Sequence, residues 1–189
     1  ITGGNGFLAQ SFSFKLIENY NLILWDLSFD KKFKKKIFDK SIKHKSSCLF
    51  QITNITKFNN VKKNILTLKD KAIYGLINCA SINPQANSKN PDYFKNYNEF
   101  IKSWNLEIDI GLKGYMTCIY EISNLMKKFK KGCIINFSSD LGLISPNQNI
   151  YKKSSPKPLV YSVSKHGIIG MTKYFSTLLA PRGIRVNSL

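Results

Sequence analysis

The chain has 189 residues, of which 43% are apolar and 21% charged, which is typical of one globular domain with its own core. Its net charge of +18 comes almost entirely from lysines spread along the sequence, so we expect a solvated surface and no nucleic-acid partner. No apolar run approaches the roughly 18 residues that cross a bilayer, and the scattered cysteines form no C-x-x-C pair. We therefore expect a cytoplasmic protein without a membrane partner or a bound metal.

Short apolar runs alternate with amphipathic stretches along the whole chain. The runs typical of buried parallel strands are 21–26, 47–53, 74–81, 132–139 and 183–189. The stretches with helical periodicity are 6–19, 29–43, 56–70, 95–129 with a break near Gly111–Gly114, and 160–180. This alternation predicts an α/β fold: a doubly wound, Rossmann-like parallel sheet with helices on both faces.

Two further features concern the ends of the chain and one lysine-rich helix. The chain begins at Ile1 rather than Met and ends at Leu189 inside an apolar run. We therefore expect a C-terminally truncated fragment, with one domain over 1–189 that is incomplete at both ends. In the Lys-rich run 31–40, Phe33 and Ile37 fall at helical spacing, with Phe38 as a third candidate, which predicts a helix with a solvated lysine face.

The opening ITGGNGFLAQSF places glycines where a strand would turn into a helix. Glycines there let the backbone bend and approach a pyrophosphate, which the N–H groups and dipole of the helix N-terminus stabilise. The residues that we expect to bind a cofactor in this turn are Gly3, Asn5, Gly6, Phe7 and Leu8.

An acidic residue, Asp26, ends the next apolar run, 20 residues after Gly6. A carboxylate at that place accepts hydrogen bonds from both hydroxyls of an adenosine ribose and repels a 2′-phosphate, so the pattern favours NAD. NADP stays an alternative because Lys31 and Lys32 follow closely. A simple strand-end cap is the alternative role for Asp26.

A tyrosine and a lysine, Tyr161 and Lys165, share one face of the last predicted helix at i, i+4 spacing. A phenol has a pKa near 10 and is a poor base at neutral pH unless a nearby ammonium favours its anion. Ser139, at the end of the 132–139 run, could orient a substrate oxygen against the phenol. Because Y-x-x-x-K arises often by chance in a Lys-rich chain, the order of the motifs matters more than the pair.

A glycine turn, Asp26, NCAS (78–81), FSSDLG (137–142) and Y-x-x-x-K follow one another, each at the carboxyl end of a strand or on the next helix. In this the chain resembles the short-chain dehydrogenase/reductase family along all 189 residues. The resemblance implies that Ser139, Tyr161 and Lys165 are catalytic and that Lys165 also binds the nicotinamide ribose. The further residues that it places near the cofactor are Gln51, Ile52, Asn78, Ala80 and Ser81.

Three departures accompany the resemblance. The opening T-G-x-x-G-x-x-A resembles the extended, sugar-nucleotide-modifying branch, whereas YSVSKHGIIGMTKYFS resembles the smaller reductase branch, which we follow because its match is longer. Gly111 stands where many members carry a catalytic Asn, so a proton relay through that side chain is absent or rerouted. Gln51 occupies a place near the adenine that is often Asp in the family, and this change keeps hydrogen bonding but loses the charge. Apart from these departures, Ser138 is a near rival of Ser139, which we choose because it directly precedes DLG.

The long irregular segment 143–159 falls beside the expected pocket and is similar to members associated with surface-polysaccharide or flagellin-glycan biosynthesis. It suggests a sugar-like substrate whose anionic group meets Lys152, Lys153 or Lys157, with a lid or subunit contact as the alternative. The resemblance also implies a homo-oligomer formed through 112–129 and 160–179. It implies an NAD(P)(H)-dependent oxidoreductase that interconverts an alcohol and a carbonyl. The alternatives are a non-catalytic dinucleotide-binding sensor or scaffold, and an extended-type epimerase or dehydratase.

Overall fold

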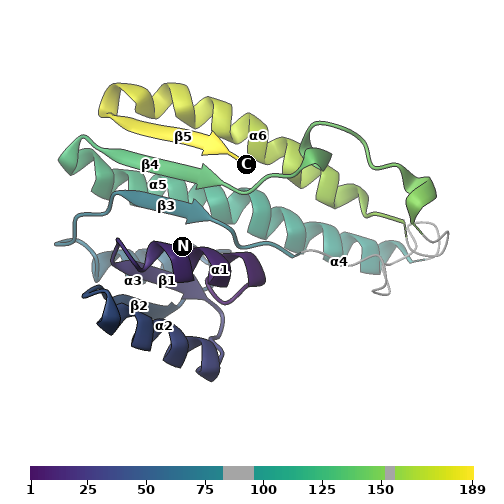
Figure 1. Cartoon of the computed structure of the whole chain (residues 1–189). Coiled ribbons are helices and arrows are strands. Elements are labelled where there is room, and N and C mark those ends of the chain that lie inside the picture. The colour runs from purple at the N-terminus through teal and green to yellow at the C-terminus, as the bar shows by residue number, and fades with distance from the viewer. Residues whose placement is uncertain (83–95, 152–155) are drawn as a thin grey trace.

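The computed structural model describes residues 1–82, 96–151 and 156–189, and its strands are all parallel (Figure 1). They are β1 (Leu22–Asp26), β2 (Cys48–Ile52), β3 (Gly75–Asn78), β4 (Gly132–Asn136) and β5 (Ile184–Ser188). β1 pairs with β2, and β4 lies between β3 and β5. The doubly wound parallel sheet expected from the apolar runs is confirmed.

Thr2 joins the two groups of strands into one sheet. It forms parallel bridges with Trp25 of β1 and with Asn78 of β3. Its backbone N–H donates to the Ile77 carbonyl at 2.9 Å, and the Trp25 N–H donates to the Ile1 carbonyl at 2.9 Å. The start of the chain therefore lies at the middle of the sheet, where the order of strands reverses. In open α/β sheets, ligands bind at the carboxyl edge beside such a reversal.

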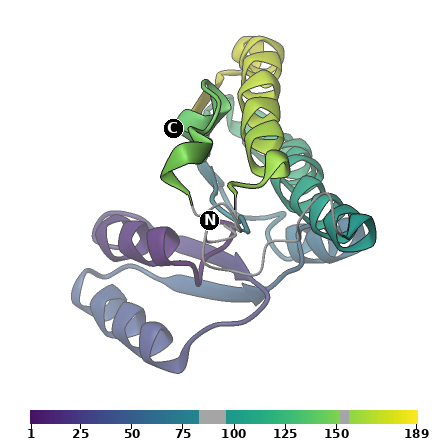
Figure 2. The same ribbon diagram turned by 90° about the vertical axis from the view of Figure 1, so that its right-hand side faces the viewer.

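Helices cover both faces of the sheet (Figure 2). They are α1 (Phe7–Leu16), α2 (Lys31–Lys43), α3 (Phe58–Leu66), α4 (Tyr97–Ile108), α5 (Tyr115–Met126) and α6 (Leu159–Leu179). One apolar core joins Val61 of α3, Ile119 of α5 and Ile168 of α6 to the sheet residue Ile134, and all four are fully buried. A second core packs α1 and α2 against the other face through Ile17, Leu24 and Ile37.

The junction of α4 and α5 is a π-helical segment, Asp109–Gly114, rather than a break. A Cβ on Gly111 would lie 2.5 Å from the Ser164 hydroxyl, and one on Gly114 would lie 2.8 Å from the Ile55 side chain. A side chain at either position would need the neighbouring Ser164 or Ile55 side chain to shift. The wide turn therefore keeps one continuous helical rod while α6 and the segment before α3 approach its backbone.

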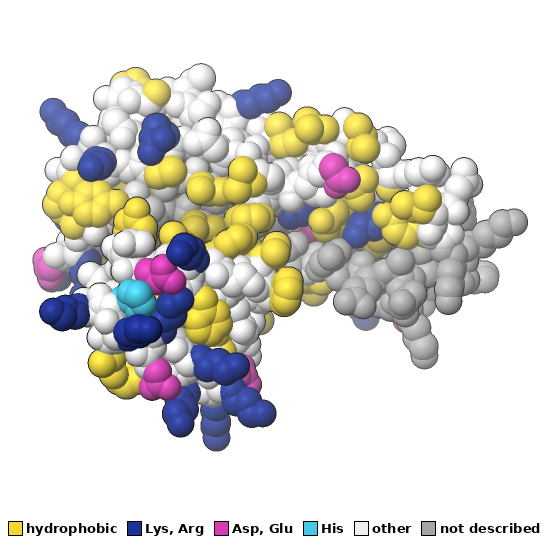
Figure 3. All heavy atoms as spheres, in the orientation of Figure 1, with side chains coloured by type: hydrophobic (Ala, Val, Ile, Leu, Met, Phe, Trp, Pro, Cys, Tyr) yellow, Lys and Arg dark blue, Asp and Glu magenta, His cyan; other side chains and the backbone are white. Residues whose placement is uncertain are grey.

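α2 has the expected lysine-covered face. The Asp30 side chain caps the helix by accepting from the Phe33 N–H at 2.8 Å. Phe33 and Ile37 are buried, whereas Phe38 is 58% exposed, so the third apolar candidate was wrong. Phe38 follows Ile37 by one position, about 100° around the helix, which turns it away from the core. The lysines of α2 project into solvent at the lower end of the molecule (Figure 3).

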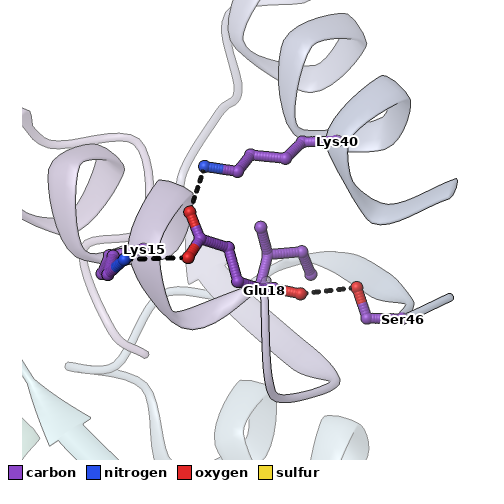
Figure 4. Close-up of polar contacts among 5 residues, drawn as sticks. Lys15, Glu18, Lys40 and Ser46 are labelled. Atoms are coloured by element: carbon purple, nitrogen blue, oxygen red, sulfur yellow. Dashed lines mark hydrogen bonds and ion pairs between the residues drawn. The ribbon is translucent and has the colours of Figure 1, made fainter. Parts of the chain in front are cut away.

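A polar cluster holds the end of α1 against α2 (Figure 4). The Glu18 carboxylate accepts from Lys40 at 2.7 Å and from Lys15 at 2.9 Å. The Ser46 hydroxyl donates to the Ile17 carbonyl at 2.6 Å. The two lysines lower the pKa of Glu18 to about 2, with Lys40 the larger cause.

Two expectations concern membranes and metals. In the described part of the chain, no helix combines the length and apolarity that crossing a bilayer needs. Within those same residues, no cluster of His, Cys, Asp or Glu side chains could ligate a metal ion.

On the helices expected to mediate self-association, the exposed apolar side chains include Met116, Tyr120, Val163, Tyr174 and Leu178. Self-association itself stays a prediction.

Candidate active site

The glycine turn is packed against the NCAS segment at the carboxyl edge of the sheet. The Thr2 hydroxyl accepts from the N–H groups of Cys79, at 3.1 Å, and Ala80, at 3.3 Å. Gly3 has a φ of +66°, and an added Cβ would lie 2.7 Å from the Ala80 Cα. Gly3 therefore has a left-handed backbone conformation and lies against the backbone of Ala80. Only glycine tolerates this combination without strain.

α1 begins directly after this turn and lacks a side-chain cap. Its N-cap residue, Gly6, provides no cap hydrogen bond, and its first turn contains no acidic residue. The first N–H groups of a helix have no partner within the helix, and together with the dipole they favour an anion. Phe7 is 86% exposed and Leu8 48% exposed beside them. These features fit a pyrophosphate group.

Asp26 ends β1 next to the turn. One carboxylate oxygen accepts from the Asn5 N–H at 2.8 Å, and the other accepts from the Leu27 N–H at 2.7 Å. These bonds fit the strand-end role. An ionised carboxylate also has capacity for further donors, so the same position fits an adenosine ribose. The turn and Asp26 together fit the adenosine and pyrophosphate parts of a dinucleotide.

Two other expected cofactor residues use their side chains inside the protein. The Gln51 side chain accepts from the Trp25 indole at 2.7 Å and donates to the Thr67 hydroxyl at 2.9 Å. Asn78 is fully buried and donates to the Asn136 carboxamide at 2.9 Å. Its own carboxamide oxygen has no hydrogen-bond partner among the residues that the structure describes.

The remaining expected cofactor residues in this region lie at strand ends. Ile52 is 65% exposed at the end of β2. Ser81 is exposed, and its hydroxyl donates to the Ile82 carbonyl at 3.2 Å. Ala80 contributes its backbone to the contact with Gly3. Ile52 and Ser81 therefore present accessible surface at the carboxyl edge, whereas Gln51 and Asn78 hold the sheet and its neighbouring helices together.

The two candidate serines point to different partners. Ser139 lies close enough to the Tyr161 phenol to lower its pKa, and its hydroxyl donates to the Asp140 carboxylate at 2.7 Å. The Ser138 hydroxyl instead donates to the Lys165 backbone carbonyl at 2.9 Å. Ser139 thus faces the phenol, while Ser138 attaches the end of β4 to α6.

Lys165 lies near the Tyr161 phenol ring and is only 4% exposed. Its ammonium donates to the Phe137 carbonyl at 2.9 Å and lies 5.4 Å from the centre of the Tyr161 ring. Burial lowers the pKa of Lys165, while the Glu107 carboxylate raises it. The structure therefore brings Ser139, Tyr161 and Lys165 together at one site.

The phenol itself is half-buried, and burial raises the pKa of Tyr161. The contact with Ser139 lowers that pKa, whereas the negative charges of Glu107 and Asp140 raise it. In the protein without ligand, the phenol is therefore protonated at neutral pH. That form suits a proton donor to a carbonyl oxygen, and a positive charge beside it is needed to make it a base.

A second lysine, Lys157, also lies close to the Tyr161 ring. Its ammonium lies 3.8 Å from the ring centre of Tyr161. The Gln148 side chain holds the backbone of Lys157 with two hydrogen bonds, accepting from its N–H at 2.9 Å and donating to its carbonyl at 3.2 Å. Burial lowers the pKa of Lys157. The other two lysines expected here, Lys152 and Lys153, fall outside the described residues.

Sequence reasoning missed two carboxylates beside the site. Asp140 accepts from Ser139, and its place within FSSDLG could have indicated this. Glu107 of α4 is 2% exposed, and its charge acts on both Tyr161 and Lys165. Its only signal in the sequence was its spacing of four residues from Gly111.

Comparison with known proteins agrees with this geometry. A family model for short chain dehydrogenases matches residues 1–189. The 3-oxoacyl-[acyl-carrier-protein] reductase of Synechocystis sp. is 36% identical over 89 residues, which make up 47% of this chain and 32% of that protein. The reductase FabG of Staphylococcus aureus is 35% identical over 88 residues, again 47% of this chain and 32% of that protein.

Solved structures share the fold over almost the whole chain. NAD⁺-bound xylitol dehydrogenase has a TM-score of 0.78 at 22% identity, covering 99% of this chain and 66% of its own. Carveol dehydrogenase from Mycobacterium avium, in complex with NAD, has a TM-score of 0.81 at 18% identity, covering 100% of this chain and 67% of its own. At such identities these matches show the fold alone.

The matched region spans about a third of the two curated relatives. Both are 3-oxoacyl-[acyl-carrier-protein] reductases, and neither name supports the expected similarity to surface-polysaccharide or flagellin-glycan members. The family model, in contrast, covers every residue from Ile1 to Leu189. The chain belongs to the short-chain dehydrogenase family.

Proposed function

We propose that the protein is an NAD(P)(H)-dependent oxidoreductase that interconverts an alcohol and a carbonyl. The observation that carries this proposal is the grouping of Tyr161 with a hydroxyl and an ammonium. Ser139 contacts the phenol, and the Lys165 ammonium lies 5.4 Å from the ring centre. Protonation of a carbonyl oxygen needs an acid in place, a partner that orients the oxygen, and a cation that stabilises the conjugate base.

Each residue has a distinct role in the proposed reaction. In reduction, Ser139 hydrogen-bonds the carbonyl oxygen and Tyr161 gives it a proton, while the carbonyl carbon accepts a hydride. Lys165 stabilises the phenolate that is left, which then regains its proton from solvent. In alcohol oxidation the phenolate removes the hydroxyl proton. When bound, a nicotinamide cofactor would supply or accept the hydride.

The cofactor is held, in this proposal, by the turn at Gly3–Gly6 and by Asp26. The uncapped start of α1 stabilises the pyrophosphate, and the Asp26 carboxylate accepts from the adenosine ribose. A carboxylate at that position favours NAD over NADP, because a 2′-phosphate would bring a second negative charge against it. The exposed Lys31 and Lys32 keep NADP as the alternative.

The substrate class rests on Lys157. We infer that its ammonium, 3.8 Å from the Tyr161 ring centre, meets an anionic group of the substrate. A sugar-like or nucleotide-sugar substrate fits this and stays a prediction, and so does an acyl carrier substrate of the kind named for the two reductases. Lys157→Ser should raise KM for an anionic ketone and leave KM for a neutral ketone unchanged. An unchanged KM for the anionic ketone would remove this role.

The proposal is tested by oxidation of NADH and NADPH with a panel of keto-sugars, β-keto thioesters and simple ketones. Tyr161→Phe should abolish turnover with the best substrate while cofactor affinity stays within about twofold, because the ring remains and only the proton is lost. Tyr174→Phe is the matched control, since Tyr174 lies on the same helix and is 64% exposed. Full turnover by Tyr161→Phe would show that the proton comes from another group.

A non-catalytic dinucleotide-binding sensor or scaffold is the second candidate. Gly111 favours it, because no side chain stands at that position in the candidate site. The same panel separates the two functions. A sensor would bind NAD(H), measured by calorimetry, and would turn over none of the substrates.

A further inference from the structure

Glu107 is a buried carboxylate that is only partly hydrogen-bonded within the described residues. It lies on α4 and is 2% exposed. One oxygen, Oε1, accepts from the Ser164 hydroxyl at 3.3 Å, and the other, Oε2, has no hydrogen-bond partner among the described residues. Burial of a carboxylate without full hydrogen bonding costs several kcal/mol, of the order set by desolvation. A buried polar atom without a hydrogen-bond partner therefore needs a specific explanation.

Glu107 contacts the helix that carries the candidate catalytic residues Tyr161 and Lys165. α4 packs against α6, where Ser164 precedes Lys165 (Figure 1). Gly111 lies one turn further along the rod, and a Cβ there would fall 2.5 Å from the Ser164 hydroxyl and 3.9 Å from Glu107 Oε1. The missing side chain at Gly111 therefore gives the Ser164 hydroxyl the space from which it reaches Glu107.

The charged and titratable groups that interact electrostatically with Glu107 come from α5, α6 and the segment just before α6. They are Lys165 and Tyr161 on α6, Lys157 just before it, and Tyr115 on α5. Burial raises the pKa of Glu107 to about 7, while Lys165 acts in the opposite direction. Reciprocally, burial lowers the pKa of Lys165, and Glu107 is the largest influence that raises it. The two groups thus stabilise each other's charged form inside the protein.

Lys165 needs such a partner. Its one hydrogen bond in the described structure goes to the Phe137 carbonyl, a neutral acceptor. A buried lysine without a nearby negative charge tends to lose its proton. Lys157, a like charge, pushes it the same way. A neutral amine would no longer stabilise a phenolate at Tyr161.

We propose that Glu107 is a positioning residue for the catalytic site, the buried counter-ion that keeps Lys165 in its ammonium form beside Tyr161. The inference rests on the proposed oxidoreductase function. In this role Glu107 acts through Lys165. Its carboxylate places a polar group of α4 close to Gly111, which has no side chain.

Glu107→Gln removes the charge but keeps the side-chain size and an oxygen that accepts from Ser164. Alcohol oxidation is the informative direction, because it requires the phenolate. At about pH 6 Glu107 is largely protonated, so the variant should match the wild-type rate. At about pH 9 it should be severalfold slower, because Lys165 loses its proton at a lower pH once the Glu107 charge is removed.

The control variants separate charge from packing. Glu99→Gln changes an exposed carboxylate in the first turn of the same helix and should follow the wild-type profile. Glu107→Asp keeps the charge and should retain most of the activity at pH 9. A rate ratio for Glu107→Gln that is constant over pH would indicate a packing role and overturn the proposal. Faster oxidation by Glu107→Gln would also overturn it, because Glu107 would then act on the Tyr161 phenol directly.

A second measurement needs no turnover and so distinguishes failure of this inference from failure of the proposed function. The Lys165 side chain is titrated by heteronuclear NMR, with its resonance assigned by Lys165→Met. Its midpoint should fall by about one pH unit or more in Glu107→Gln and stay unchanged in Glu99→Gln. An unchanged midpoint in Glu107→Gln would refute the counter-ion role even if the enzyme were active. A shifted midpoint without turnover on any substrate would count against the oxidoreductase function alone.

Discussion

Gly3→Ala tests whether the glycine turn is built for close backbone approach. Gly3 has a φ of +66°, and the added methyl would lie 2.7 Å from the Cα and 2.8 Å from the N of Ala80. The left-handed backbone costs a non-glycine residue roughly 1–2 kcal/mol, and overpacking against backbone atoms costs about 1–3 kcal/mol more. We expect a loss of about 2–5 kcal/mol in the free energy of unfolding. At this chain length that lowers Tm by at least about 4 °C.

The assay combines thermal unfolding with NAD(H) affinity measured well below Tm. Gly183→Ala is the matched control, because Gly183 has a φ of +71° and its Cβ would overlap the Lys130 carbonyl. Gly183 lies at the amino end of β5, on the opposite edge of the sheet. Both variants should lose stability, but only Gly3→Ala should lose affinity. If Gly3→Ala keeps the wild-type Tm and affinity, the reasoning about close approach is refuted.

Ile134→Ala empties a fully buried position in β4 and should lower the free energy of unfolding by about 2–5 kcal/mol in urea titrations; a loss below about 1 kcal/mol would contradict the packing described. Glu18 has a folded pKa of about 2, below its ordinary value of 4.5, so its stabilising effect is present above pH 4.5 and is lost as the pH falls toward 2. Glu18→Gln should therefore lower Tm at pH 7, and the two Tm values should converge toward pH 3, whereas a difference independent of pH would contradict the ion-pair account. Iodoacetamide should leave Cys118 unmodified in the folded protein, because it is fully buried and burial raises its pKa to about 12; rapid labelling in mass spectra would argue against that burial.

The strands were predictable from the sequence because short apolar runs followed by polar or turn residues are typical of strands in a parallel sheet. The run 21–26 became Leu22–Asp26, and 47–53 became Cys48–Ile52. Helix ends were less predictable, since they depend on contacts from elsewhere. The stretch 56–70 formed a helix from Phe58 to Leu66, and the next residue, Thr67, donates its hydroxyl to the Asn64 carbonyl and accepts from the Gln51 side chain.

Within the candidate site, motif spacing placed Tyr161 and Lys165 on one helix face, as i, i+4 geometry requires. Spacing could not decide between Ser138 and Ser139, because the choice depends on which hydroxyl faces the Tyr161 phenol after β4 ends. Nor could it reveal Glu107, since a charged residue on an amphipathic helix is usually solvated. Only the packing of α4 against α6 shows that this carboxylate is buried against Ser164, the residue before Lys165.

A double-mutant cycle on Ser139→Ala and Tyr161→Phe tests most directly whether one site carries out the reaction. Turnover is measured for the wild type, both single variants and the double variant with the best substrate from the panel. When two residues act as a unit, substituting either one already removes the contribution of both to the rate. The double variant should therefore be no slower than the slower single variant. Losses that multiply in the double variant would mean that Ser139 and Tyr161 act independently, and would contradict the account.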